Sequence, residues 1–235
     1  MNKKIYYSPR PDTITYDEDL YIPIKNNKNI FSSESAFSYC PAWKHQTSKT
    51  FTAYASSYLH FQIEDRVTVK SDNLNQQEFD NTIILNNGWN VGEQVTIQIS
   101  NQFSNFFWTY DKNIWISILP HPLTSLNNNF YHCGAWFNLS NWPRIINLGA
   151  IVIDENKPVV IKRGDPLYNI KFHTQNQNDT FNLIRSEIDQ KKFDKSISKS
   201  QFVLNKRHSK DYYYYDVLFE SKKESKCPFR FFWNK

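Results

Sequence analysis

The sequence predicts a mainly β protein, a single antiparallel β-sandwich or barrel with a short helical, aromatic C-terminal appendage. Residues 158–172 contain two alternating runs on either side of a Gly-Asp-Pro turn, which is the pattern of two short strands. Other apolar runs follow at a spacing of about ten residues, with turn formers between them, as in sandwiches and barrels. Aromatic residues make up 17% of the 235 residues and supply the apolar area that such a core needs.

The first 44 residues are expected to form an extended N-terminal arm. A strand is predicted around residues 5–7, and it ends at Pro9 and Pro11 because proline cannot donate a hydrogen bond to a neighbouring strand. The rest of this segment holds turn formers, among them Pro23 and Pro41, and shows no regular period. An arm of this kind can reach over a neighbouring molecule.

Residues 45–175 are expected to form the core of the sandwich or barrel. The pattern predicts strands at residues 51–54, 58–69, 81–85, 94–100, 103–110 and 114–119, and along the apolar run 144–153. The strongest turn signal between them is the Asn-Asn-Gly-Trp-Asn stretch at 86–90. Residues 158–172 are then expected to close the sheet as a hairpin.

Residues 176–235 are expected to form the appendage. Asp179 or Thr180 suits a helix N-terminus, and Phe181, Ile184 and Ile188 follow at spacings of three and four. This pattern predicts one or two amphipathic helices between residues 181 and 207. The aromatic end of the chain is expected to pack on the core or on a neighbouring subunit, because such a segment does not stay exposed to water.

The charge distribution and the cysteines indicate where in the chain a partner could bind and in which cellular compartment the protein resides. The net charge is +5, and residues 181–235 hold 13 Lys and Arg against 7 Asp and Glu, so the excess lies at the C-terminal end. Neither a signal peptide nor a membrane span is recognisable, so the protein is expected neither to be secreted by a signal peptide nor to enter a membrane. Three widely spaced cysteines indicate thiols in a reducing compartment.

No local motif indicates catalysis, a cofactor or a metal. The six histidines form no H-x-H, H-x-D or H-E-x-x-H pattern, so we expect no metal site, although Cys40, His121, His132 and Cys133 could meet in the folded chain. Nucleophile motifs such as G-x-S-x-G and phosphate-binding glycine loops are absent. The sequence therefore favours a protein that is not an enzyme and has no cofactor.

Residues 149–172 offer an enzymatic alternative. They read G-A-I-V-I-D-E-N, then K-P-V-V-I-K-R-G-D-P-L-Y-N-I-K-F, and resemble the closing strands of the dUTPase and dCTP-deaminase group, which has a β-clip fold. The resemblance implies that Asp154 is the catalytic carboxylate, which activates water beside a deoxyribose. The residue pattern itself leaves the other interpretation open, in which Asp154, Glu155 and Asn156 form a turn.

A second resemblance covers more of the chain. The Tyr-Tyr-Ser-Pro start at residues 6–9, Cys-Pro-Ala at 40–42, Trp-Phe at 136–137 and I-K-R-G-D-P-L-Y at 161–168 resemble an uncharacterised family of small proteins from tailed bacteriophages of aquatic bacteria. This resemblance implies a phage origin and no particular activity. It places the protein in the virion or in the cytoplasm of the infected cell.

The function expected from the sequence is therefore that of a non-catalytic phage structural or accessory protein. It is expected to act through protein–protein contacts and to be oligomeric, because aromatic side chains suited to interfaces are abundant. Basic and aromatic residues also alternate at the C-terminal end, which leaves single-stranded nucleic-acid binding as an alternative. The residues expected to contact a partner are Arg207, Tyr212, Tyr213, Tyr214, Tyr215, Phe229, Arg230, Phe231 and Trp233.

Overall fold

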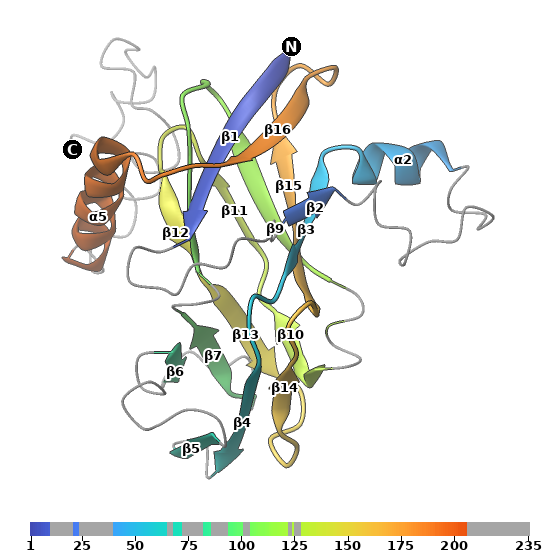
Figure 1. The fold of residues 1–235 in the computed structure, drawn as a ribbon, viewed down its shortest axis with the longest axis vertical. Coiled ribbons are helices and arrows are strands. Elements are labelled where there is room, and N and C mark those ends of the chain that lie inside the picture. Colours follow the sequence, from blue (N-terminus) through green and yellow to red (C-terminus); the bar gives the residue numbers. More distant parts are fainter. Residues whose placement is uncertain are drawn as a thin grey trace, which may run out of the picture.

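A computed structural model describes residues 1–9, 21–23, 40–64, 68–71, 82–85, 94–100, 104–121, 124 and 128–205. Within these residues the fold is mainly β, with several sheets and one helix near the C-terminus, and no closed barrel is found (Figure 1). The predicted fold class is therefore confirmed, in its sandwich form.

The described strands form four sheets. The first has the order β12-β8-β1-β16 (Arg144–Ile146, Asn105–Thr109, Asn2–Pro9, Thr180–Arg185). The second, of five strands, has the order β11-β9-β15-β3-β2 (Ala135–Asn138, Trp115–Pro120, Pro166–His173, Thr50–Tyr54, Tyr21–Pro23). The third is β10-β13-β7-β6 (Phe130–His132, Leu148–Val152, Thr96–Ile99, Ile83–Leu85), and the fourth is β14-β4-β5 (Val159–Ile161, Leu59–Glu64, Thr68–Ser71).

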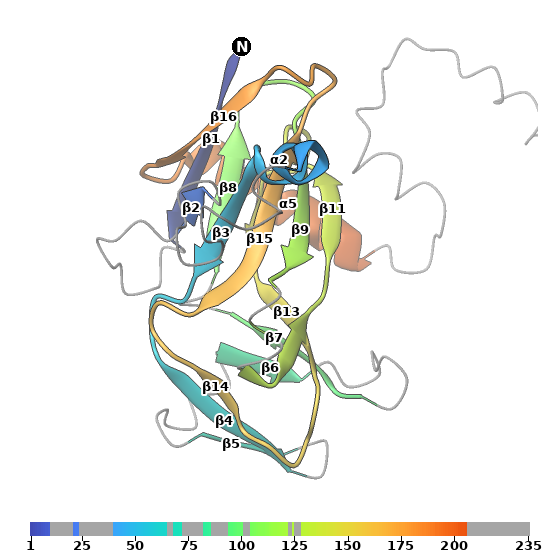
Figure 2. The ribbon, with the colours of Figure 1, turned by 90° about the vertical axis from the view of Figure 1, so that its right-hand side faces the viewer.

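The first two sheets face each other across an aromatic core. The Tyr21 ring of β2 lies 5.2 Å from the Phe107 ring of β8, and the Phe172 ring of β15 lies 5.4 Å from the Phe181 ring of β16. The third and fourth sheets lie below this pair in Figure 2 and share one continuous hydrophobic cluster with it. Large aromatic side chains thus fill the space between sheets, as the composition predicted.

The first strand of the chain lies inside a sheet. β1 runs antiparallel to β8 and parallel to β16, and its side chains Ile5 and Tyr7 are buried. The beginning of the segment expected to be an arm is therefore part of the core sandwich. Residues 10–20 and 24–39 of that segment lie outside the described residues.

The prediction of one or two helices between residues 181 and 207 is confirmed by one helix, but its first part is wrong, because residues 180–185 form strand β16. Phe181 and Leu183, two residues apart, pack against the core, while six consecutive residues of β16 pair with β1. Pairing with a strand far away in the sequence thus overrides a spacing that also fits a helix. A helix does follow, since α5 spans Gln190–Asn205 and packs Phe193 against Phe106 of β8 at 5.2 Å.

The predicted hairpin at residues 158–172 is also wrong in its pairing. Both strands exist, but β14 pairs with β4 and β15 pairs with β3 and β9, so the Gly-Asp turn carries the chain from one sheet to another. Two backbone hydrogen bonds, both 2.9 Å long, join this turn to Ala55, which lies between β3 and β4. They run from Ala55 N to Asp165 O and from Gly164 N to Ala55 O. Gly164 has φ +84°, which glycine adopts without strain.

The apolar run 144–153 crosses between sheets in the same way. β12 pairs with β8 in the first sheet, whereas β13 pairs with β7 and β10 in the third. At the crossing point Asn147, the side-chain oxygen accepts a 2.7 Å hydrogen bond from Ser104. Periodicity predicted the strands, and these crossings explain why it did not predict their partners.

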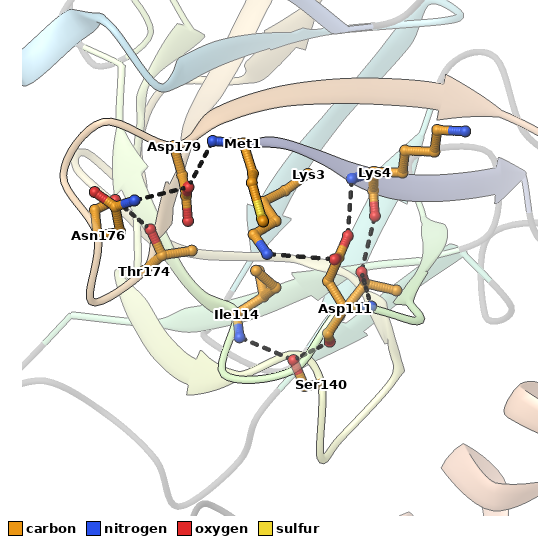
Figure 3. Close-up of polar contacts among 10 residues, drawn as sticks. Met1, Lys3, Lys4, Asp111, Ile114, Ser140, Thr174, Asn176 and Asp179 are labelled. Carbon is orange, nitrogen blue, oxygen red and sulfur yellow. Dashed lines mark hydrogen bonds and ion pairs between the residues drawn. The ribbon is translucent and has the colours of Figure 1, made fainter.

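Two carboxylates tie the end of β1 to neighbouring loops (Figure 3). Asp179 accepts hydrogen bonds from the amino group of Met1 at 3.0 Å and from Asn176 Nδ2 at 3.3 Å, and the bond with the amino group lowers the Asp179 pKa. Asp111 accepts from the Lys4 backbone N–H at 3.0 Å and from Lys3 Nζ at 3.5 Å. Asp179, predicted as a helix cap, therefore serves a strand end.

A second helix of the described residues, α2, spans Pro41–Thr47 and precedes β3. It begins with proline at its first position, where the missing N–H has no intrahelical partner to lose. None of the helices in the described part of the chain is both long and apolar enough to cross a membrane.

Candidate functional site

A serine and a histidine meet on the outer face of the five-stranded sheet, the face turned away from the β12-β8-β1-β16 sheet. Ser117 Oγ on β9 lies 2.7 Å from His173 Nε2 on β15. Ile116 and Ile118, the neighbours of Ser117, are buried in the core, so alternation along the strand directs Ser117 outward.

Two lysines place positive charge beside this pair. Lys171 on β15, which is 8% exposed, lies directly opposite Ser117 in the strand register. Lys49 precedes β3 at the end of the sheet, where its Nζ donates a 2.8 Å hydrogen bond to Gln177 O and lies 5.8 Å from the centre of the Phe181 ring. Burial lowers the pKa of His173, and the charges of Lys171 and Lys49 lower it further. Burial and the charge of Lys49 also lower the pKa of Lys171. The electrostatic field at His173 from these two lysines thus favours an anion.

Two tryptophans continue the same face toward the sheet edge. Trp115 and Trp136 have ring centroids 4.8 Å apart, and Trp136, on edge strand β11, is 66% exposed. The register places Trp136 opposite Ser117, and Trp115 opposite His173. We call the six residues Trp136, Trp115, Ser117, His173, Lys171 and Lys49 the basic–aromatic strip.

The Ser117–His173 pair has the spacing of a nucleophile and its general base. Proton transfer from Ser117 would leave an imidazolium beside the ammonium groups of Lys171 and Lys49, and like charges oppose that product. A neutral imidazole and a hydroxyl beside cations are instead suited to hydrogen-bond an anionic group. The geometry therefore favours binding over general-base catalysis at this position.

A second exposed surface lies along the segment that joins β10 and β11. Tyr131 is 46% exposed on β10, Trp136 is 66% exposed on β11, and Gly134 and Ala135 between them are exposed as well. Among the described strands, β10 pairs only with β13 and β11 only with β9. We call residues 131–136 the β10–β11 edge, since it presents the margins of two sheets in succession.

The interior holds an unusual histidine. His132 is 2% exposed, and neither ring nitrogen has a hydrogen-bond partner. Its ring lies 4.8 Å from that of Tyr168, whose hydroxyl is 3.3 Å from the hydroxyl of Tyr21. Burial lowers the pKa of His132 to about 4 and raises that of Tyr168 to about 12. Both groups are therefore neutral at physiological pH.

Asp154, the catalytic carboxylate of the enzymatic alternative, lies in the turn after β13. Its Oδ1 accepts a 3.0 Å hydrogen bond from the Asn156 backbone N–H, and its Oδ2 lies 3.1 Å from Lys157 Nζ. These two interactions, in that order, lower the pKa of Asp154. The partner residues predicted at the C-terminus, from Arg207 to Trp233, lie outside the described residues.

Sequence reasoning missed the strip because its members come from distant segments. One signal was present, since Lys171 lies on a predicted strand and His173 directly follows that strand, so that a continuation by one residue would place both on one face. Their meeting with Ser117 depends on the pairing of β9 with β15, for which the sequence has no local signature.

Ligation of a metal is not indicated in the described ranges, where no three His, Cys, Asp or Glu residues gather in a suitable cluster. The chain matches no protein-family model, and a comparison with curated proteins finds no match.

Proposed function

We propose that this chain is a non-catalytic structural or accessory protein of a tailed bacteriophage, which works through contacts between copies of itself in the virion or in the infected cell. The phage setting rests on the sequence resemblance described above. The β10–β11 edge is the observation that carries the self-association, because two sheet margins and two exposed aromatic side chains follow each other there.

The physical argument concerns backbone groups and rings. Strands at a sheet edge offer backbone N–H and C=O groups that a strand of another molecule can pair with. Tyr and Trp are enriched at protein interfaces, where each buries a large area at a low entropic cost. Tyr131 and Trp136 thus supply apolar area for an interface, and the backbone groups beside them can fix the orientation of the partner strand by hydrogen bonds.

Light scattering on the full-length protein over a range of concentrations tests the proposal. The unmodified chain is expected to be an oligomer, and Tyr131→Glu is expected to weaken self-association by about 30-fold or more, because it places a charge in a desolvated interface. Ile197→Glu is the matched control, since Ile197 is 39% exposed on α5 and lies outside the β10–β11 edge.

Two results would contradict the proposal. One is a monomeric mass for the unmodified chain at every concentration. The other is an oligomer that survives both Tyr131→Glu and Trp136→Glu while each variant keeps the thermal unfolding midpoint of the control.

A further inference from the structure

We propose that the basic–aromatic strip binds a ligand that combines an aromatic base with a phosphate group, the chemistry shared by a nucleotide and a single-stranded nucleic acid. The proposed self-association rests on the β10–β11 edge, which shares Trp136 with the strip, so Lys49→Gln, outside that edge, is the variant that tests this inference separately. It concerns the outer face of the five-stranded sheet and not the C-terminal residues expected from the sequence to bind nucleic acid.

The aromatic half of the strip provides a stacking surface. Trp136 leaves two thirds of its surface in water, and Trp115 supports it from one side with an interplanar angle of 34°. Bases stack on such indoles without regard to sequence, because every base has a π-face. An exposed indole held by a second indole is thus positioned in advance for a base.

The basic half of the strip provides for a phosphate. Lys171 stands opposite Ser117 in the register and two residues from His173 on the same face of β15, and Lys49 precedes the neighbouring strand β3. The Ser117 hydroxyl and the His173 ring, 2.7 Å apart, add hydrogen-bonding groups between the lysines and the tryptophans. Charge and hydrogen bonds together are the usual means of holding a phosphate.

The strand register sets the two halves at a suitable separation. Trp136, Ser117 and Lys171 stand opposite one another on β11, β9 and β15 and form one row across the sheet. Two strand spacings amount to roughly 10 Å, which a nucleotide spans from base to phosphate. The ligand would lie across the strands, with its base over Trp136 and its phosphate toward His173.

The test measures binding of a fluorescein-labelled ten-nucleotide oligothymidylate to the full-length protein by fluorescence polarisation at low salt. We expect Trp136→Ala to weaken binding about tenfold, which is the loss of one stacked base. Lys49→Gln is expected to weaken it and to make its salt dependence less steep, because one phosphate contact is lost.

Tyr58→Ala and Lys157→Gln are the matched controls, since they remove an exposed aromatic ring and an exposed lysine that belong neither to the strip nor to the β10–β11 edge. Both should bind the oligonucleotide as the unmodified protein does. Competition separates the two sources of the ligand, because thymidine monophosphate displaces the probe only if a single nucleotide suffices. Equal unfolding midpoints confirm that each variant is folded.

Three results would overturn the proposal. The first is no binding of either the oligonucleotide or the nucleotide. The second is equal binding by the strip variants and the controls. The third is loss of binding only when Arg207 and Arg230 are replaced by alanine, which would assign the ligand to the C-terminal residues.

Discussion

His132 and His173 occupy opposite environments in the same sandwich. Both have a lowered pKa, and burial is the main cause in each case. His132 lies in the interior between sheets, where its ring nitrogens have no partner, whereas His173 lies on the outer face with Ser117 at 2.7 Å and two lysines nearby. The pKa of His132 is lowered because nothing around its buried ring stabilises the charged form. The pKa of His173 is lowered by burial and, in addition, by the positive charges of Lys171 and Lys49.

The difference separates what stability requires from what binding requires. A neutral ring packed against Tyr168 fills space in the core, and its titration can only destabilise the fold. A neutral ring beside cations sits in a field that an anionic ligand would balance. We therefore associate the interior with stability and the outer face with recognition, and three experiments probe that division.

Adjacent residues of β15 give the largest contrast. Phe172→Ala is expected to lower the free energy of unfolding by about 3–5 kcal/mol, because Phe172 is fully buried and its ring packs against Phe51 and Phe181. His173→Ala removes a hydrogen bond on the outer face and is expected to cost about 1 kcal/mol. Urea titrations of both variants measure this, and equal losses would refute the division.

Acid is expected to destabilise the fold through protonation of the buried His132. The pKa of His132 is about 4 in the folded state against 6.5 for the ordinary group, so its contribution to stability is complete above pH 6.5 and is lost as the pH falls from 6.5 toward 4. The loss amounts to about 3 kcal/mol, since each pKa unit corresponds to about 1.4 kcal/mol.

His132→Leu is therefore expected to flatten the dependence of unfolding free energy on pH between 7 and 4 by about 3 kcal/mol. Chemical denaturation at a series of pH values measures it. His45→Gln, which replaces an exposed histidine on α2, serves as the control for the loss of a histidine. A variant profile as steep as that of the unmodified protein would show that His132 is not the group responsible.

The smallest effect is expected on the outer face. Lys49→Gln removes one of the positive charges that lower the pKa of His173, so that pKa should rise toward 6.5. The pKa of His132, which has no lysine among its causes, should stay unchanged. Titration of the histidine ring resonances by NMR measures both groups in one sample, and a shift of equal size at His132 would contradict the assignment.

Much of the fold could be predicted from local pattern. The predicted strands at 94–100, 103–110 and 114–119 correspond to β7, β8 and β9, because alternation of apolar residues reports burial of one face. Pairing was not predictable, since residues 158–172 form two strands that belong to different sheets. Phe181 and Ile184 fit a helix equally well until β1 is placed beside them.

Less of the candidate site could be predicted. Asp154 was found by its resemblance to a family motif, and in the structure its carboxylate bonds with its own turn. Ser117 and His173 belong to no local motif, Trp136 belongs only to the Trp-Phe pair of the phage resemblance, and the three meet through the register of three strands. A site assembled by register is invisible to motif searches, although the shared face of Lys171 and His173 gave a partial signal.

The parallel pairing of β1 with β16 also bears on how the chain is made. Asn2 aligns with Thr180, so the sheet cannot be completed until 178 further residues have been synthesised. At ribosomal rates of roughly 5–20 residues per second, β1 waits on the order of 10–35 s for this partner. During that interval one margin of the first strand is available to other chains, and translation speed thereby becomes a determinant of the yield of folded protein.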